Sequence, residues 1–292
     1  RSCASVESLR RLGYHTRLDF LPLVRSLPLR FCALASGSKG NAVYVGGSRR
    51  GVLIDAGLPG RQIEQRLAAR GLDAQSVAAV VVTHEHRDHI SGVGVWGRRY
   101  GVPVYMTPAC RRGAEEVLGP RGLHGVEVRE FEPGQVFPVG DLEFLSVATS
   151  HDAAESVGFR VTDGATVLGF ATDLGCVSPV LRVALRGAHL LYLESNHDED
   201  LLWNGPYPWF LKQRIRSDRG HLSIGECAGL AGSLLHDGLR ALVLGHLSEI
   251  NNQPHLAFRR ARQLLDEHGA ADDVTLLVAR QDRPGRVVEW AA

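Results

Sequence analysis

The segment His84-Glu85-His86-Arg87-Asp88-His89 holds three imidazoles and the Asp88 carboxylate within six residues. It follows Thr83 and the run Val77–Val82, and such short, β-branched, apolar runs are typical of a buried strand. Histidines two positions apart lie on opposite sides of a helix, so the segment is not the helical HExxH zinc motif. In a loop that leaves a strand the four side chains can converge, and such clusters usually bind metal. The alternative is a solvated polar loop, and four ligand-type residues in six argue against it.

Other potential ligands follow apolar runs elsewhere in the chain. The residues at such strand ends are Asp55, His84, His151, Asp173, His197 and His246. Because packed sheets bring neighbouring strand ends together, we expect these residues to share one rim of the fold.

Apolar periodicity predicts the elements that position these residues. Strands are expected over 29–35, 42–45, 52–54, 77–82, 102–106, 142–147, 157–161, 166–171, 189–193, 241–244 and 274–278. Helices are expected over 60–70, 90–100, 108–118, 180–185, 223–236 and 257–268. The chain shows no internal repeat or low-complexity linker, so the simplest arrangement is one domain with two sheets between helices, over 29–292. Residues 1–28 form an N-terminal extension to which we assign no role.

Composition limits the classes of protein that fit. The 292 residues are 44% hydrophobic with a net charge of +1, which allows a large core and excludes a global basic field for nucleic acid. No stretch approaches the roughly 20 apolar residues of a membrane span, and residues 1–28 lack the apolar core of a signal peptide. A disulfide framework is not expected and a cytoplasmic location fits best, because the cysteines are odd in number and scattered: Cys3, Cys32, Cys110, Cys176 and Cys227.

The segment Thr83–Gly92, THEHRDHISG, resembles the HxHxDH signature of the metallo-β-lactamase fold family. The resemblance covers residues 29 to about 280 and implies an α/β architecture, an αββα sandwich with a metal site at the edge of the two sheets. It implies seven ligands: His84, His86 and His151 for a first ion, Asp88, His89 and His246 for a second, and Asp173 as a bridge. Asp55 matches the family's buried supporting acid, and Glu194 is a further acid at a strand end.

Two divalent ions about 3.5–4 Å apart lower the pKa of a shared water and neutralise developing charge. Asp88 can also accept a hydrogen bond from that water and orient it. A bridging Asp gives an oxygen and nitrogen shell that suits manganese as well as zinc. Cys176, three residues beyond Asp173, is the alternative ligand, but a small buried hydrophobic residue is the better interpretation of it.

A second resemblance is carried by several segments in one order, and it is to the YycJ/WalJ group of exonucleases, relatives of RNase J and tRNase Z. The segments are SGSKGN (36–41), SHDA (150–153), ATDLG (171–175), ESNHD (194–198), GPYPWFLKQRI (205–215), GHLS (220–223) and HLSEINN (246–252). The resemblance implies a metal-dependent nuclease, with 5′→3′ exonuclease action on DNA as the main expectation. An RNA-processing endonuclease and a thioester or lactone hydrolase are alternatives, and a metal-stabilised binding module without catalysis is a third class.

Several residues are candidates for handling such a substrate. His221 resembles the tRNase Z histidine that helps to protonate a leaving oxygen, and the alternative is a residue at a helix start, where Ser223 is a possible N-cap. Trp209 is expected to stack on bases, and Lys212 and Arg214, near Arg216 and Arg219, are expected to contact phosphates. The alternative is that the aromatic residues of this segment form a lid packed on the core. Ser38 and Asn41 are candidates for binding a terminal phosphate, and the alternative is an ordinary hairpin turn. Asn196 and His197 are candidates for phosphate contacts, with a simple turn as the alternative, and Asn251 and Asn252 are expected to order their loop. A second basic and aromatic face is possible, with ordinary solvated charge as the alternative, and it would consist of Trp96, Arg98, Arg99, Tyr100, Arg111 and Arg112.

Overall fold

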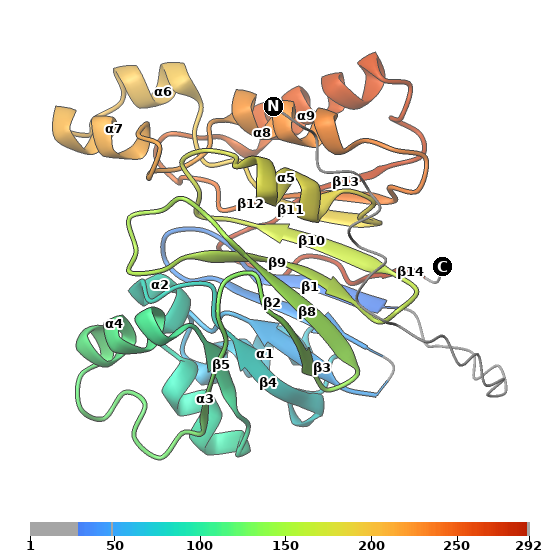
Figure 1. Ribbon diagram of the computed structural model, residues 1–292. Coiled ribbons are helices and arrows are strands. Elements are labelled where there is room, and N and C mark those ends of the chain that lie inside the picture. Colours follow the sequence, from blue (N-terminus) through green and yellow to red (C-terminus); the bar gives the residue numbers. More distant parts are fainter. Residues whose placement is uncertain (1–28, 48, 291–292) are drawn as a thin grey trace, which may run out of the picture.

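Two seven-stranded sheets lie face to face between layers of helices (Figure 1). The computed structural model describes residues 29–47 and 49–290, so the N-terminal extension 1–28, with Cys3, lies outside the described residues. The first sheet has the order β14 (Val288–Trp290), β1 (Leu29–Ala35), β2 (Ala42–Gly46), β3 (Gly51–Ile54), β4 (Val77–Val81), β5 (Val104–Met106) and β6 (Val128–Glu130). The second has the order β13 (Thr275–Val278), β12 (Ala241–Gly245), β11 (Leu190–Glu194), β10 (Val167–Ala171), β9 (Val157–Thr162), β8 (Leu142–Ala148) and β7 (Val136–Val139).

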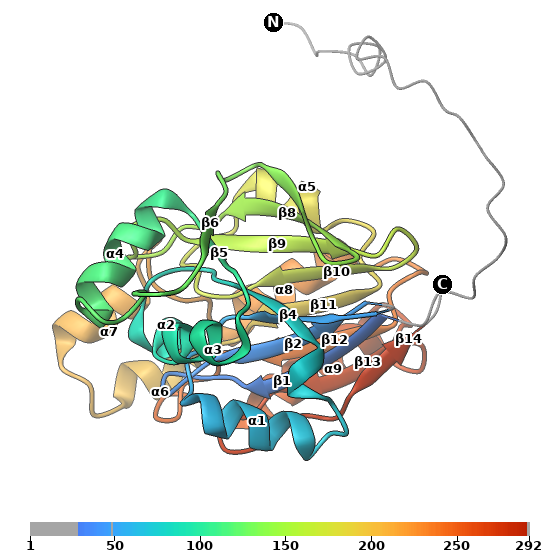
Figure 2. The same ribbon diagram turned by 90° about the horizontal axis from the view of Figure 1, so that it is seen from below.

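The helices cover the outer faces of the sheets. The first sheet is covered by α1 (Gly60–Ala68), α3 (Val93–Tyr100) and α4 (Pro108–Leu118), and the second by α5 (Pro179–Leu185), α8 (Ile224–Leu234) and α9 (Pro254–Glu267). Three short helices remain, α2 (Arg87–Ile90), α6 (Glu199–Asn204) and α7 (Trp209–Ile215), besides a 3₁₀ turn at Ala74–Ser76. Figure 2 shows α2, α4, α6 and α7 gathered at one end of the molecule.

The central strands are apolar on both faces because the middle of each sheet is buried on both sides. In β11, Leu190 and Tyr192 face the core between the sheets, whereas Leu191 and Leu193 face the helices. Successive side chains of a strand point to opposite faces, so a strand covered on both sides reads as a continuous apolar run. The predicted αββα sandwich is confirmed.

Parallel pairing brings the potential ligands to one edge. The strands β3, β4, β5 and β6 are parallel, and so are β10, β11, β12 and β13. Since parallel strands end at the same edge of a sheet, the residues that follow β3, β4, β10, β11 and β12 meet there. The loop after β8 reaches this edge as well, as the contacts of His151 show below.

Some predicted boundaries were wrong. The helix expected over 90–100 is interrupted at Gly92, where a Cβ atom would lie 2.0 Å from the carbonyl oxygen of Leu58. The strand expected over 102–106 begins only at Val104. The strands β6, β7 and β14 and the helices α6 and α7 were not predicted. The hairpin around Asp163-Gly164 is confirmed as β9 and β10.

Candidate metal centre

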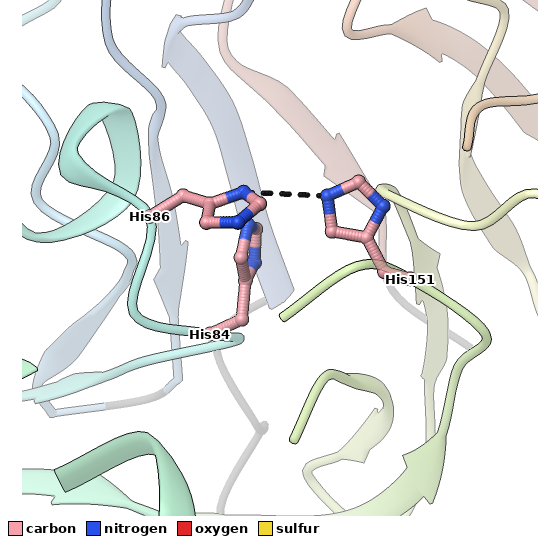
Figure 3. Close-up of side chains that lie close together, drawn as sticks. All are labelled: His84, His86 and His151. Carbon is pink, nitrogen blue, oxygen red and sulfur yellow. Dashed lines mark hydrogen bonds between the residues drawn. The ribbon is translucent and has the colours of Figure 1, made fainter. Parts of the chain in front are cut away.

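Three histidines from two loops form the first group of potential ligands. His84 and His86 lie in the loop after β4, and His151 lies in the loop after β8. Figure 3 shows the three rings pointing toward one another, with 3.3 Å between Nδ1 of His86 and Nε2 of His151. One ring nitrogen from each residue falls within a 4.8 Å cluster. Three imidazole nitrogens at such spacing would suit a divalent transition-metal ion.

A second group lies beside the first and contains more carboxylate. One ligand atom from each of Asp88, His89 and His246 falls within 4.8 Å of the others. Asp173 joins the two groups, because its Oδ1 lies 3.3 Å from Nε2 of His246 and 3.8 Å from Nε2 of His151. Its Oδ2 lies 3.4 Å from Nε2 of His89. All seven residues expected as ligands therefore come together, and we call them the rim: His84, His86, Asp88, His89, His151, Asp173 and His246.

Several rim atoms have no partner within the protein. Nε2 of His84, Oδ2 of Asp173 and Nε2 of His246 are buried without a hydrogen bond. Leaving a buried polar atom unpaired is costly, and a shared cation satisfies all three at once. The donor set of nitrogen and oxygen fits divalent metal ions.

The other nitrogen of each buried ring is held by an acceptor. Nδ1 of His89 lies 2.7 Å from Asp55, and Nδ1 of His151 lies 3.0 Å from the carbonyl oxygen of Gly220. Asp55 also accepts hydrogen bonds from the Thr83 amide and hydroxyl at 2.8 and 2.9 Å. Such partners set the tautomer and aim the opposite nitrogen at a metal.

Glu194 connects the rim to His221. It is fully buried, and its Oε1 lies 2.7 Å from Nδ1 of His221 and 3.1 Å from Nδ1 of His246. Its Oε2 accepts from the backbone amides of Leu174 and Leu222. Burial raises the pKa of Glu194, but the two histidines outweigh burial and hold that pKa well below its usual value. One ionised carboxylate therefore orients a ligand and the candidate proton donor.

The two ligand groups differ in their electrostatics. Burial, aided by the neighbouring imidazoles, holds the pKa of His84 well below its usual value, so His84 stays neutral with a lone pair to offer. Burial also acts on His246, but Asp173, Asp88 and Glu194 outweigh it and raise its pKa to about 10. The second group therefore carries the stronger negative field for a cation.

Three rim-side residues have a left-handed backbone. Asp55, Asp173 and His246 have φ angles of 60°, 56° and 53° and are the non-glycine residues with positive φ among the described residues. This conformation is unfavourable for residues with a Cβ atom, and such strain concentrates at functional sites. Each bend turns the chain one or two residues past the end of a strand.

A pocket of about 170 Å³ opens beside the second group. Its lining includes His221 and His246 from the centre, and Ser38, Asn196 and Arg214 from the expected substrate residues. Nε of Arg214 donates to Oδ2 of Asp152, whose Oδ1 lies 3.4 Å from Nε2 of His151. Sequence reasoning did not single out Asp152, although it directly follows a predicted ligand.

Four expected substrate residues lie elsewhere. Asn41 contacts Gly37, Asp88 and His89 through its amide and supports the second group instead. His197 is buried and is not part of the pocket lining. Trp209 and Lys212 lie on the opposite face of α7 from Arg214.

Other expectations can be compared with the structure. Asn252 donates to the carbonyl groups of Ser195 and Asn196, as expected of a loop-ordering residue. Ser223 forms a capping box with Glu226 at the start of α8, which agrees with the N-cap alternative. Cys176 belongs to none of the potential metal groups among the described residues, but it is exposed, so its interpretation as a small buried hydrophobic residue was wrong.

Most residues expected in the second basic and aromatic face make local contacts within the fold. Trp96 is fully buried, and Arg99 and Tyr100 both contact Glu64. Arg98 donates to carbonyl groups of the loop 121–124, and Arg111 pairs with Glu115 and Glu130. These side chains are used in packing and local charge pairs.

Comparison with known proteins agrees with this fold. The profile of the beta-lactamase superfamily domain matches residues 50–246. The crystal structure of the metallo-β-lactamase fold protein YhfI from Bacillus subtilis superposes with a TM-score of 0.68 at 18% identity, covering 90% of this chain and all of that one. The chain is therefore a protein of the metallo-β-lactamase fold.

Two curated relatives identify the branch. Exodeoxyribonuclease YycJ of Bacillus anthracis is 38% identical over 241 residues, which are 82% of this chain and 90% of that protein. Exodeoxyribonuclease WalJ of Streptococcus pneumoniae serotype 2 is 36% identical over 228 residues, 78% of this chain and 85% of that protein. The chain belongs to the YycJ/WalJ family within the beta-lactamase superfamily, and its class is that of a metal-dependent hydrolase of the nuclease type. Among the described residues, no helix has the length and apolar character needed to cross a bilayer.

Proposed function

We propose that this protein is a two-metal phosphodiesterase that degrades DNA from its 5′ end. The observation that carries the proposal is the pair of ligand groups joined by Asp173, beside a pocket that His246 lines. The names of the relatives YycJ and WalJ, both exodeoxyribonucleases, support DNA as the substrate. The pocket is small, but the basic Arg214 at its wall suits a phosphodiester better than a neutral thioester or lactone.

We propose His84, His86 and His151 as ligands of one ion, Asp88, His89 and His246 as ligands of the other, and Asp173 as the bridge. Two bound divalent ions supply an activated water near neutral pH and positive charge for the phosphodiester. The shell contains only nitrogen and oxygen donors, so manganese and zinc are both suitable occupants.

The protein's own residues position the reactants. The Asp88 side chain is 25% exposed, while those of its neighbours His89 and Asp173 are almost fully buried. One Asp88 oxygen is therefore available to accept a hydrogen bond from the attacking water. His221 donates through Nδ1 to Glu194, so its Nε2 remains free to protonate the leaving 3′ oxygen.

Arg214 holds the phosphate. Asp152 engages Nε of this guanidinium, and neither terminal nitrogen of Arg214 has a hydrogen-bond partner among the described residues. The two terminal nitrogens can therefore bind phosphate oxygens as a fork.

The proposal is tested with purified protein, Mn²⁺ and duplex DNA labelled at its 5′ or 3′ end. Early release of a labelled mononucleotide from the 5′ end supports it, and the same panel with RNA tests an RNA-processing role. Asp88→Ala should abolish cleavage without changing the melting curve by more than a few degrees. No metal-dependent degradation of any DNA would sink the proposal.

A further inference from the structure

The segment Glu199–Ile215, which contains α6 and α7 and which we call the arm, has an exposed aromatic surface. Trp203 is 51% exposed, Trp209 55% and Phe210 71%, and among the residues whose side-chain exposure is described the next most exposed Trp or Phe is Phe258 at 38%. A single exposed apolar side chain is ordinary. Here Trp203 and Trp209 are in contact and Phe210 is the next residue of α7, and clustered exposed apolar side chains of this kind mark binding surfaces. The structure thus contradicts a core-packed aromatic lid.

The two tryptophan rings are held in place. They meet edge to face with centroids 5.1 Å apart and an angle of 85°. Nζ of Lys212 donates to the Trp203 carbonyl at 2.7 Å, and the Arg216 guanidinium lies 5.7 Å from the centre of the Trp203 ring. These contacts order the rings while about half of each side chain stays open, so a ligand that stacks on them loses little conformational entropy.

The positive charge beside the two tryptophans, which continues past the end of the arm, selects the partner. Lys212 and Arg216 line a hollow of about 370 Å³ together with the two tryptophans. Residues 212–219 contain four basic residues and one acidic residue. A strand of nucleic acid carries both flat rings and regular negative charge, so it complements the aromatic and the basic parts of the surface together.

The arm surface continues from the pocket beside the metal centre. Leu211, Arg214 and Ile215 line that pocket, whereas Trp209 and Lys212 line the hollow on the other side of α7. Figure 1 shows the arm standing out at the same end of the molecule as α2, which carries Asp88 and His89. A strand whose reacting phosphate lies at the rim can cross α7 and place its next bases on the arm.

We infer that Trp203, Trp209, Phe210, Lys212 and Arg216, the arm platform, bind unpaired nucleotides of the strand that the enzyme degrades. The inference rests on the proposed function and adds a substrate class, a DNA end with a single-stranded segment. Insertion of successive bases onto the platform needs unpaired bases, because inside a duplex both faces of each base are covered and a blunt end offers only the outer face of its last base pair. The platform therefore distinguishes an unpaired end from a blunt one.

The test measures binding without cleavage, with the Asp88→Ala protein and two fluorescent probes, an oligothymidylate and a blunt hairpin duplex of equal charge. Replacing Trp209 by Ala in this background should weaken oligothymidylate binding by roughly 5- to 150-fold. Binding of the hairpin should change less than twofold. Trp209→Phe keeps a stacking ring and should restore most of the affinity, and Phe258→Ala on α9 is the matched control with no expected change.

Three results would overturn the inference. They are equal losses for both probes, no loss for either, or a dimer by sedimentation that Trp209→Ala converts to a monomer, which would make the platform an interface between two copies. Melting curves confirm that each variant is folded, and Phe210→Ala repeats the test if Trp209→Ala is not. Because binding is measured without cleavage, a protein that binds the oligothymidylate as expected but cuts no DNA contradicts only the proposed function.

Discussion

The pocket beside the rim and the hollow of the arm platform lie on opposite sides of α7. The side chains of the rim and of the platform are held to very different degrees. The rim residues His84, Asp173 and His246 are at most 4% exposed, and second partners hold most of the rim rings. The platform residues Trp209 and Phe210 are more than half exposed. Reaction chemistry needs fixed donors in a dry environment, whereas binding of any base sequence needs only accessible rings and charge.

The difference follows from where the two regions lie in the fold. The rim follows strands in the middle of two packed sheets, and these strands unfold only with the whole domain. The arm consists of a six-residue and a seven-residue helix joined through Pro206 and Pro208, outside both sheets. Substitutions at the rim should therefore affect chemistry by orders of magnitude, and those on the arm should affect binding of particular substrates.

The largest effect is expected at the bridge. Asp173→Ala removes the carboxylate that joins the two ligand groups, so cleavage of 5′-labelled DNA should slow by about a thousandfold or more. Elemental analysis should find less bound metal than in the unmodified protein, whereas oligothymidylate binding should fall by less than tenfold. Activity within tenfold of the original would mean that Asp173 is no bridge.

His221→Ala should have the next largest effect, a loss of roughly 100- to 10,000-fold in the single-turnover rate on DNA. The metal content should stay unchanged, because His221 is not among the proposed ligands. A phosphodiester with a p-nitrophenolate leaving group needs no proton donor, so its hydrolysis should be nearly normal. Equal losses on both substrates would assign His221 a structural role.

Asp152→Asn tests whether Asp152 acts in substrate binding, through Arg214, or at the metal centre. The substitution weakens the hydrogen bond that orients Arg214, and a bond to a charged group contributes about 1.5 kcal/mol or more, so KM should rise about tenfold with kcat nearly unchanged. Arg214→Gln should raise KM similarly, and the double variant should be no worse than the worse single variant. Loss of bound metal in Asp152→Asn would instead make Asp152 a ligand.

The smallest effect is expected from the platform charges. Replacing both Lys212 and Arg216 by Ala should reduce the slope of log affinity against log salt by about 0.7 for each lost phosphate contact with a single strand. Arg259→Ala, an exposed arginine of α9, is the control. An unchanged salt slope would show that these two side chains only support Trp203.

The sequence predicts the central strands well and the peripheral ones poorly. Runs such as Val77–Val81 are apolar on both faces, so they stand out against the loops. By contrast, β6 has three residues that include Arg129 and Glu130, and β7 contains Pro138 with alternate residues exposed. Short, half-exposed edge strands differ little from loops in composition, because the sheet demands little of their side chains.

The gathering of the proposed ligand residues was predictable because each follows an apolar strand. Parallel pairing brings most of these strand ends to one edge, whereas His151 follows β8, which pairs antiparallel with β9. Their grouping into two sets came from the family resemblance, because strand ends alone do not say which residues share an ion. The sequence did not predict that the side chains of Lys212 and Arg214 lie on opposite sides of α7. Residues two apart lie on opposite sides of a helix, but α7 was not predicted, since Pro206 and Pro208 precede it in a segment that has the composition of a loop.

The left-handed backbone at Asp55, Asp173 and His246 lowers the stability of the fold at positions where the proposed activity needs these side chains. At these positions one residue has to make a bend that suits glycine and also provide a carboxylate or an imidazole, and no amino acid does both without strain. The free energy of unfolding of Asp173→Gly should therefore exceed that of Asp173→Ala by about 1 kcal/mol, although we expect both variants to be inactive. In a relative that has lost nuclease activity, we expect glycine to replace the Asp or His at these bends. The residue found at these positions therefore indicates whether a relative of this protein is still an active enzyme.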